Sequence, residues 1–427
     1  MNTSALRPIL LPNGTFEMGR LDGWETSGAK ASTAQGTLAS GAQRTIMFNI
    51  LLLGVTSFFT DVSSEMIYPL VPFFLTLKLG ASPAVMGLIE GIAESVASLL
   101  KIFSGYISDR LRNRKGLTIV GYGSSAIGKL LLYIAAGWPM VLAGRVVDRL
   151  GKGIRTAPRD ALIADSSADG KRGSSFGLHR ALDSGGAVVG VLLAYFFFTS
   201  LAKGEYATVF LWSIIPAAIG VVLLFFVREA KPREGTPAQL PALRWSVLPR
   251  KLKLFLVVAL IFTLGNSSNT FLLLRADTLG FTPALAIVLY LVYNVVYAVV
   301  SYPAGRLSDK IGRKRLLVAG YAFYGLVYLG FALVNAPQRA WVLWLLFGLY
   351  GLYIGFTDGV EKALVSDLAP ANLRATAIGL HATIVGIGLF PASLIAGQLW
   401  DRVGPAAAFY FGGGTGLFAA IGLMMVL

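Results

Sequence analysis

The chain has 427 residues, of which 55% are hydrophobic and 14% are charged, and its formal net charge is +15. Soluble domains average roughly 25% charged residues, so the composition argues against a soluble core and for lipid as the solvent. The chain has no cysteine and two histidines, which excludes disulfides and thiolate chemistry and argues against a histidine-rich metal site. We expect no metal and no cofactor.

The chain begins with a polar segment. Residues 1–44 are rich in Gly, Ser, Thr and Ala and have no long apolar run, which predicts a disordered tail and not a signal peptide. The apolar run that follows carries carboxylates and is too long to be a cleavable segment. It is therefore predicted as the first membrane span.

Apolar stretches of ~20 residues or more then recur along the chain, each bounded by Gly, Pro or basic residues. The first six predicted spans cover 46–76, 83–107, 116–136, 139–163, 175–199 and 207–227. A polar, basic and Pro-rich stretch at 228–252 predicts a linker. The second six spans cover 253–279, 282–307, 315–334, 339–365, 374–400 and 405–427. We expect an all-α membrane protein of twelve transmembrane helices, in two six-helix bundles at 45–227 and 253–427.

The basic residues gather in alternate loops. They cluster at 110–115, 171–172, 228–253, 306–315 and 374, and only scattered ones occur in the other loops. By the positive-inside rule the clusters face the cytoplasm, which puts both termini in the cytoplasm and the chain in the inner membrane. The lipid bilayer therefore explains the net charge, and we expect no nucleic acid partner.

The two predicted halves repeat each other. The phrase "GYISDRLRNRK" at 105–115 returns as "GRLSDKIGRKR" at 305–315, and Gly80 and Gly280 stand at the same offset. His179 and His381, the two histidines of the chain, also occupy equivalent positions. Such agreement indicates two pseudo-symmetric bundles built from one repeat.

These residues carry a resemblance. From residue 45 onward the chain resembles a major facilitator superfamily transporter, because the family's loop motif G-x-x-x-D-[RK]-x-G-[RK]-[RK] is matched at 305–314. The first copy departs from it, with Arg112 in the place of a Gly and one inserted residue. The stretches "FTDVSSEMIYPLVPFFL" and "GKGIRTAPRDALIAD" resemble a bacterial and archaeal branch whose substrates are mostly unassigned. The resemblance implies transport by two halves that rock about a site at mid-depth.

The repeated loops are expected to form a cytoplasmic gate. A carboxylate at the end of a span can accept hydrogen bonds from the N–H groups of a neighbouring helix start and from a nearby Arg. The alternative is that these basic residues only set the topology. The expected gate residues are Gly105, Asp109, Arg110, Arg114, Gly305, Asp309, Lys310 and Arg313.

Four carboxylates lie inside the first two predicted spans. Asp61 and Glu65, and likewise Glu90 and Glu94, are spaced i, i+4, so each pair shares one helical face. A charge at that depth costs ~2.5–3.5 kcal/mol and needs a partner, a watery cavity or a proton. We predict all four as proton-coupling candidates. The alternatives are structural ion pairs with the basic residues of span four and a bound metal cation.

Substrate contacts are expected from both halves. The first half supplies a stripe of basic residues on span four, and the second half has neutral residues where the first has acids, since Ser267-Ser268-Asn269 corresponds to Ser63-Ser64-Glu65. The alternative for the Asn and Tyr residues is packing between helices. The expected contacts are Arg145, Arg149, Asn266, Asn269, Tyr293, Asn294 and Tyr353.

His179 and Asp183 are one helical turn apart at the start of span five, which suits a proton relay. His381 occupies the equivalent place without an acid one turn later, which favours a packing or gating role for both histidines.

No G-x-S-x-G motif, Walker loop or zinc signature occurs, so we expect no enzyme activity. We expect a monomeric secondary transporter of a small-molecule substrate, coupled to protons, with export preferred over uptake. The alternatives are an uptake permease, an uncoupled facilitator, and a transporter-like protein that serves as a sensor or assembly partner.

Overall fold

The computed structural model describes residues 7–10, 16–19, 48–111, 113–167, 172–229, 248–335, 340–370 and 373–426. Most of the expected linker at 228–252 therefore lies outside the described residues. In the expected disordered tail, strand β1 (Arg7–Leu10) pairs antiparallel with strand β2 (Phe16–Gly19). The other residues of the tail lie outside the described residues, so the disordered tail stays a prediction.

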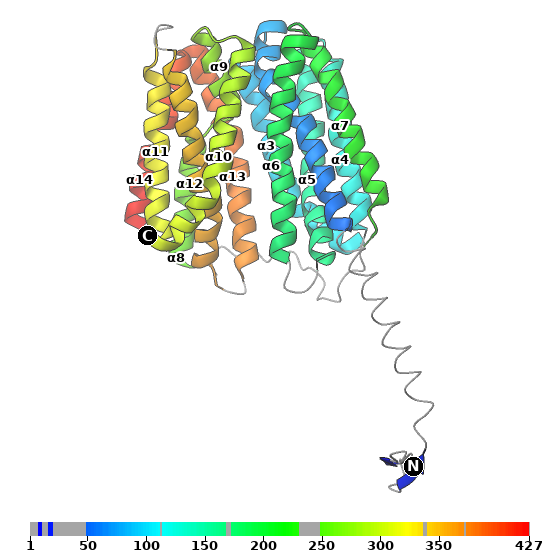
Figure 1. The fold of residues 1–427 in the computed structure, drawn as a ribbon. Coiled ribbons are helices and arrows are strands. Elements are labelled where there is room, and N and C mark those ends of the chain that lie inside the picture. Colours follow the sequence, from blue (N-terminus) through cyan, green and yellow to red (C-terminus); the bar gives the residue numbers. More distant parts are fainter. Residues whose placement is uncertain are drawn as a thin grey trace, which may run out of the picture.

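The remaining described elements are helical, and they run up and down through one bundle (Figure 1). The first span, Phe48–Lys78, ends in the short segments η1 (Tyr68–Leu70), α2 (Val71–Phe73) and η2 (Phe74–Lys78). After it come α3 (Pro83–Leu111), α4 (Arg114–Tyr133), α5 (Trp138–Asp165), α6 (Arg172–Phe196), η3 (Phe197–Leu201) and α7 (Tyr206–Phe226).

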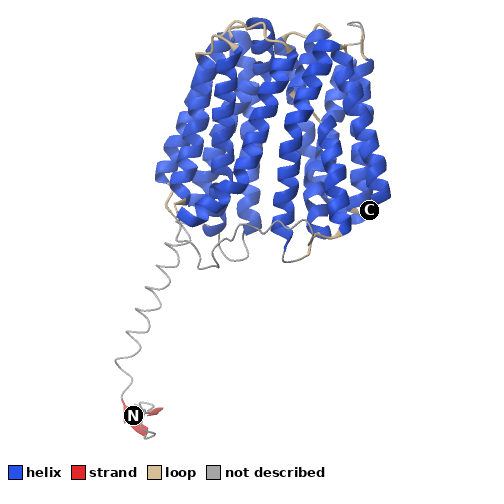
Figure 2. Ribbon diagram, turned by 180° about the vertical axis from the view of Figure 1, so that it is seen from behind, coloured by secondary structure: helices blue, strands red, loops and turns tan. Residues whose placement is uncertain are grey.

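The second half begins with α8 (Arg250–Gly265) and α9 (Thr270–Thr278). It continues with α10 (Pro283–Ile311), α11 (Arg313–Leu333), α12 (Val342–Leu368), α13 (Arg374–Arg402) and α14 (Pro405–Val426). Seen from behind, the long helices again lie side by side and are joined by short loops at both ends (Figure 2). We call the end where α7 ends and α8 begins the linker end.

Nine helical segments within the described residues are long and apolar enough to cross a membrane. The long helices α3, α4 and α5, which have 29, 20 and 28 residues, are not among these nine segments. The all-helical membrane fold is therefore confirmed, and the described part places six long helical segments before residue 230 and six after residue 247.

The same turn precedes the second helix of each half. Gly80 and Gly280 have φ values of +63° and +89°, which L side chains rarely adopt. Pro83 and Pro283 then occupy the first residue of α3 and α10, where a missing N–H costs nothing. The repeat seen in the sequence thus corresponds to a repeated turn.

Span seven is broken, although the sequence analysis predicted one continuous helix over 253–279. Residues Asn266 to Asn269 separate α8 from α9, because Asn and Ser side chains compete for backbone hydrogen bonds and lower the helix propensity. Nearby side chains compensate the break: the Tyr324 hydroxyl donates to the Gly265 carbonyl at 2.8 Å, and the Ser268 N–H donates to Ser393 Oγ at 3.3 Å. Such a break is tolerated at membrane depth where it lines a cavity.

The two halves meet mainly where α3 packs along α13. Glycines allow the close approach, since Gly87 lies against the Ser393 backbone and Gly91 against Phe390. At the end away from the linker, the Ala84 N–H donates to an Asp401 carboxylate oxygen at 3.1 Å.

Candidate functional site

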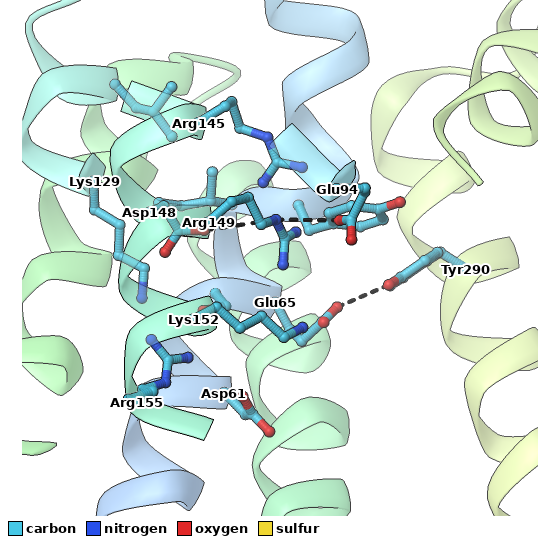
Figure 3. A pocket seen from close by; sticks show the side chains of 14 residues that line it. Asp61, Glu65, Glu94, Lys129, Arg145, Asp148, Arg149, Lys152, Arg155 and Tyr290 are labelled. Atoms are coloured by element: carbon cyan, nitrogen blue, oxygen red, sulfur yellow. Dashed lines mark hydrogen bonds and ion pairs between the residues drawn. The ribbon is translucent and has the colours of Figure 1, made fainter. Parts of the chain in front are cut away.

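A charged cavity lies in the first half, between the first span, α3, α4 and α5, and Tyr290 of α10 closes one side (Figure 3). It encloses about 790 Å³, part of it open to solvent. Its lining includes the carboxylates of Asp61, Glu65, Glu94 and Asp148 and the cationic side chains of Lys129, Arg145, Arg149, Lys152 and Arg155. We call it the charged cavity.

Glu90 and Arg145 form a closed pair beside this cavity. Glu90 is fully buried, and Arg145 donates from Nε to Oε1 at 2.9 Å and from Nη2 to Oε2 at 2.7 Å. The Arg145 guanidinium also lies 5.6 Å from the centre of the Tyr68 ring. Two parallel bonds of this kind hold both side chains in one geometry, so the ion-pair alternative fits Glu90 and Arg145 best.

Glu94 pairs with Arg149 more openly. Arg149 Nε lies 3.2 Å from Glu94 Oε1 and 3.9 Å from Asp148 Oδ2. The Glu94 side chain is 31% exposed, so water reaches it. This pair is therefore open to water, whereas the Glu90 pair is enclosed.

Glu65 has a neutral partner instead. The Tyr290 hydroxyl, from the other half, donates to Glu65 Oε2 at 2.9 Å (Figure 3). In the described part of the chain, no cationic nitrogen lies within 4.0 Å of the Glu65 carboxylate. Glu65 is thus a cavity carboxylate that is held by a hydrogen bond between the halves.

Asp61 lies against a second acid. The negative charge of Asp183 on α6 acts on its carboxyl group, and two neighbouring carboxyl groups disfavour both being ionised. Ser57 Oγ donates to Asp183 Oδ1 at 2.7 Å, and Arg180 Nη1 lies 3.4 Å from Oδ2. His179 Nε2 is buried and has no hydrogen-bond partner among the described residues, which fits the packing or gating role better than the relay alternative.

The sequence analysis missed three charged residues of this cavity, Lys129, Asp148 and Arg155, and also its tyrosines Tyr68 and Tyr290. Lys129 is 2% exposed, and its Nζ has no hydrogen-bond partner in the described structure. Arg155 donates to Ser125 Oγ, and its guanidinium lies 4.4 Å from the centre of the Tyr122 ring. A lone lysine in the otherwise apolar predicted span 116–136 was a usable signal, since an intramembrane ionisable residue indicates function by default.

A second cavity of about 990 Å³ lies mainly in the other half and shares Tyr68 and Glu94 with the charged cavity. The broken span lines it, together with α12 and α13. We call it the aromatic cavity, because Phe262, Tyr350 and Tyr353 also line it. The two cavities are adjacent parts of one central space.

Of the expected substrate contacts in the second half, three line the aromatic cavity: Asn266, Asn269 and Tyr353. Asn266 Nδ2 donates to the Tyr353 hydroxyl at 3.2 Å, and Tyr350 donates to Asn269 Oδ1 at 2.7 Å.

The two remaining expected contacts lie elsewhere. Asn269 Nδ2 donates to the Tyr293 hydroxyl at 3.2 Å, and Asn294 Nδ2 donates to the Tyr290 carbonyl of its own helix at 2.9 Å. Neither Tyr293 nor Asn294 is among the residues that line the two cavities.

The second half also brings two acids to this space, which the sequence analysis did not name: Asp358 and Glu361 both line the aromatic cavity. His381 Nε2 lies 3.5 Å from Glu361 Oε2, so this histidine has an acidic partner from α12. Asp358 accepts hydrogen bonds from Lys362 at 2.8 Å and from Tyr297 at 3.2 Å. Sequence spacing could not show the His381 pair, because its members lie on different helices.

The expected gate residues lie at the linker end. Arg313 Nε lies 2.7 Å from Asp367 Oδ2, and its Nη2 lies 3.7 Å from Asp309 Oδ1. In the first half, Arg114 forms the equivalent ion pair with Asp165. Each cluster therefore joins helices of one half in this conformation.

The remaining gate residues make fewer contacts. Arg110 and Lys310 are exposed, and Gly105 and Gly305 are half-buried near the same helix ends. The side chain of Asp109 lies outside the described residues.

Comparison with known proteins identifies the family. The model of the Major Facilitator Superfamily matches residues 53–392. An uncharacterised MFS-type transporter of Methanocaldococcus jannaschii is 39% identical over 389 residues, which cover 90% of this chain and 96% of that protein. The multidrug resistance protein MdtH of Escherichia coli is 24% identical over 338 residues, 78% of this chain and 82% of that protein.

The crystal structure of the nucleoside transporter NupG has the same fold, with a TM-score of 0.76 at 13% sequence identity over 88% of this chain and 98% of that one. The chain is thus a multi-pass membrane transport protein of the kind that binds small molecules, and it is not an enzyme. It belongs to the Major Facilitator Superfamily.

Proposed function

We propose that the chain is a proton-coupled secondary transporter of a small organic solute, which works by alternating access between its two halves. The bond between Glu65 and Tyr290 carries this proposal. It places a carboxylate without a cation partner in the charged cavity and ties it to the opposite half at 2.9 Å.

Protonation of Glu65 would act on that bond. A hydrogen bond to an ionised carboxylate is roughly twice as strong as one between neutral groups. A proton on Glu65 therefore weakens the contact between the first span and α10, and loss of the proton strengthens it. Proton binding in this way biases the equilibrium between two arrangements of the halves.

Asp61 and Asp183 form a second candidate proton site, because two neighbouring carboxyl groups disfavour both being ionised. Glu94 can contribute through its water-accessible pair with Arg149. We assign Glu90 to structure, since Arg145 binds both of its oxygens.

We further propose that the linker end faces the cytoplasm of the inner membrane. Basic residues crowd there, with Arg114 and Lys115 opening α4, Arg250 and Lys251 opening α8, and 313–315 opening α11. This distribution agrees with the positive-inside rule. The sequence analysis preferred export only by analogy with the family. The positive charge of the cavity favours the uptake alternative, for the reasons given in the next subsection.

The test uses the purified chain in proteoliposomes with a pH-sensitive dye inside. Addition of a transported solute should move protons in the native chain. The variant Glu65→Gln should lose this proton movement and keep solute exchange, whereas Glu205→Gln, at a side chain that is 62% exposed, should behave like the native chain.

Unchanged proton movement in both Glu65→Gln and Asp61→Asn would overturn the coupling proposal. If no solute of a broad panel is transported by the native chain, the sensor alternative is favoured.

A further inference from the structure

We propose that the substrate is an organic anion, whose acidic group binds Lys129, Lys152 and Arg155 in the charged cavity and whose planar body lies in the aromatic cavity. The binding site follows from the geometry alone. The role of the bound anion as the transported substrate rests on the proposed function.

The first step is that three cations of the charged cavity lack an acidic partner. Arg145 and Arg149 are paired with Glu90 and Glu94. For Lys129, Lys152 and Arg155, in contrast, no carboxylate oxygen of the described residues lies within 4.0 Å. All three line the same cavity, and two of them come from one face of α5 (Figure 3).

The second step concerns Lys129. A buried ammonium group without a hydrogen-bond acceptor is strongly unfavourable, and its Nζ has no such acceptor in the described structure. The Nζ belongs to a residue that is 2% exposed and lines the cavity. A carboxylate or similar oxyanion that entered the cavity would supply the missing acceptor.

The third step concerns the rest of the ligand. The side-chain amides of Asn266 and Asn269 already form hydrogen bonds with tyrosine hydroxyls. A ligand in the aromatic cavity would therefore contact aromatic rings more than free hydrogen-bond donors. Phe262 and Tyr353 present such surfaces. Ring faces and an adjoining cationic site suit a flat, unsaturated body with one acidic group.

The fourth step links the anion to the proton. The charged and titratable groups near Asp61 and Glu65 include Lys129 of α4, Asp183 of α6, Tyr290 of α10, and Arg145, Arg149, Lys152 and Arg155 of α5. An anion bound to Lys152 and Arg155 neutralises the positive charge that favours the ionised form of these two acids. The two acids then bind protons more readily. Protons and anion therefore enter the cavity together, which corresponds to transport of both in one direction and favours uptake.

The experiment measures binding to the purified full chain by titration calorimetry. The probes are benzoate and naphthalene-2-carboxylate, each compared with its carboxamide and with the corresponding arylmethylamine. The carboxylates should bind at least about tenfold more tightly than their amides, because a hydrogen bond to a charged group contributes about 1.5–3 kcal/mol. Repeating the titration in buffers with different ionisation enthalpies should show proton uptake on binding.

Variants locate the site. Lys129→Gln, Lys152→Gln and Arg155→Gln should each weaken carboxylate binding by roughly tenfold and leave amide binding unchanged. Lys78→Gln removes one exposed positive charge outside the cavities and should change neither. Lys152→Arg keeps the charge and should retain most of the affinity, which separates loss of charge from loss of folding.

Three outcomes would overturn this inference: no preference of the native chain for carboxylates over amides, tighter binding of the amines, or proton release on binding. The proposed function fails independently. If carboxylates bind as described but are never transported, the binding site stands and the proposed transporter function fails. If only the amines are transported with protons, the transporter function stands and the anion site fails.

Discussion

The Tyr290 hydroxyl of α10 donates a 2.9 Å hydrogen bond to Glu65 of the first span, so this bond joins the two halves inside the charged cavity. The two halves also meet between α3 and α13, where Ser393 is buried against Gly87. Any change that weakens the bond between Tyr290 and Glu65 should make that interface easier to open.

Tyr290→Phe removes this bond and keeps the ring. Because the chain has no cysteine, Ser393→Cys provides a single reactive thiol at the closed interface. Its labelling by a membrane-impermeant maleimide should accelerate about tenfold or more in the Tyr290→Phe background, given about 1.5–3 kcal/mol for a bond to a charged acceptor. Tyr302→Phe, at a side chain on the same helix that is 73% exposed, is the control. Equal labelling rates in the two backgrounds would contradict the role of the bond.

Glu90→Gln should destabilise the protein strongly. It leaves Arg145, which is 3% exposed, without its charged partner, and breaking a buried ion pair from one side costs about 3–5 kcal/mol. Denaturant unfolding in detergent measures the loss. Glu205→Gln disrupts an exposed pair with Lys78 and should change the free energy of unfolding by less than about 0.5 kcal/mol. A similarly small effect for Glu90→Gln would show that the pair is not structural.

His381 and Glu361 should behave as one unit. Their side chains lie 3.5 Å apart on α13 and α12, and residues in contact show interaction energies of about 0.5–3 kcal/mol in double-mutant cycles. The cycle of His381→Gln and Glu361→Gln, read from unfolding free energies, should give a value in this range. A cycle of His381→Gln with Glu205→Gln should be additive. Additivity in both cycles would argue that the His381 contact is incidental.

Arg313→Asp should lower stability modestly, and Asp367→Arg in the same chain should restore it. The pair is 2.7 Å long but lies on partly exposed side chains, so its contribution is about 0.2–1 kcal/mol. Thermal unfolding midpoints compare the single and double variants. Lys310→Asp applies the same charge change three residues earlier and should not be rescued by Asp367→Arg. If Asp367→Arg does not restore the stability, the contact between Arg313 and Asp367 does not stabilise the protein. Arg313 would then serve only to set the membrane topology.

The fold was predictable because hydropathy, basic loops and turn glycines act locally. Gly80 and Gly280 mark the same turn in both halves, and the span boundaries follow from the residues beside them. The break at Asn266 was missed because helix propensity is weak against a strong apolar signal, and its compensation by Tyr324 comes from another helix.

The candidate site was predictable in part. The i, i+4 spacing placed Asp61 and Glu65 on one face, and both line the charged cavity. The same spacing does not predict that Glu90 forms a buried pair with Arg145 while Glu94 stays partly exposed, because the partner of each side chain is set by tertiary packing. Lys129 carried a usable signal that was overlooked.

The charge carried by three consecutive helices also constrains how the protein is made. Glu90 on α3 has its partner Arg145 on α5, 55 residues later in the chain. Until α5 has been synthesised, release of α3 into lipid would leave a bare carboxylate in the hydrocarbon. Insertion of α3 is therefore favoured either with Glu90 protonated or together with α4 and α5, so that Arg145 enters the bilayer with its partner.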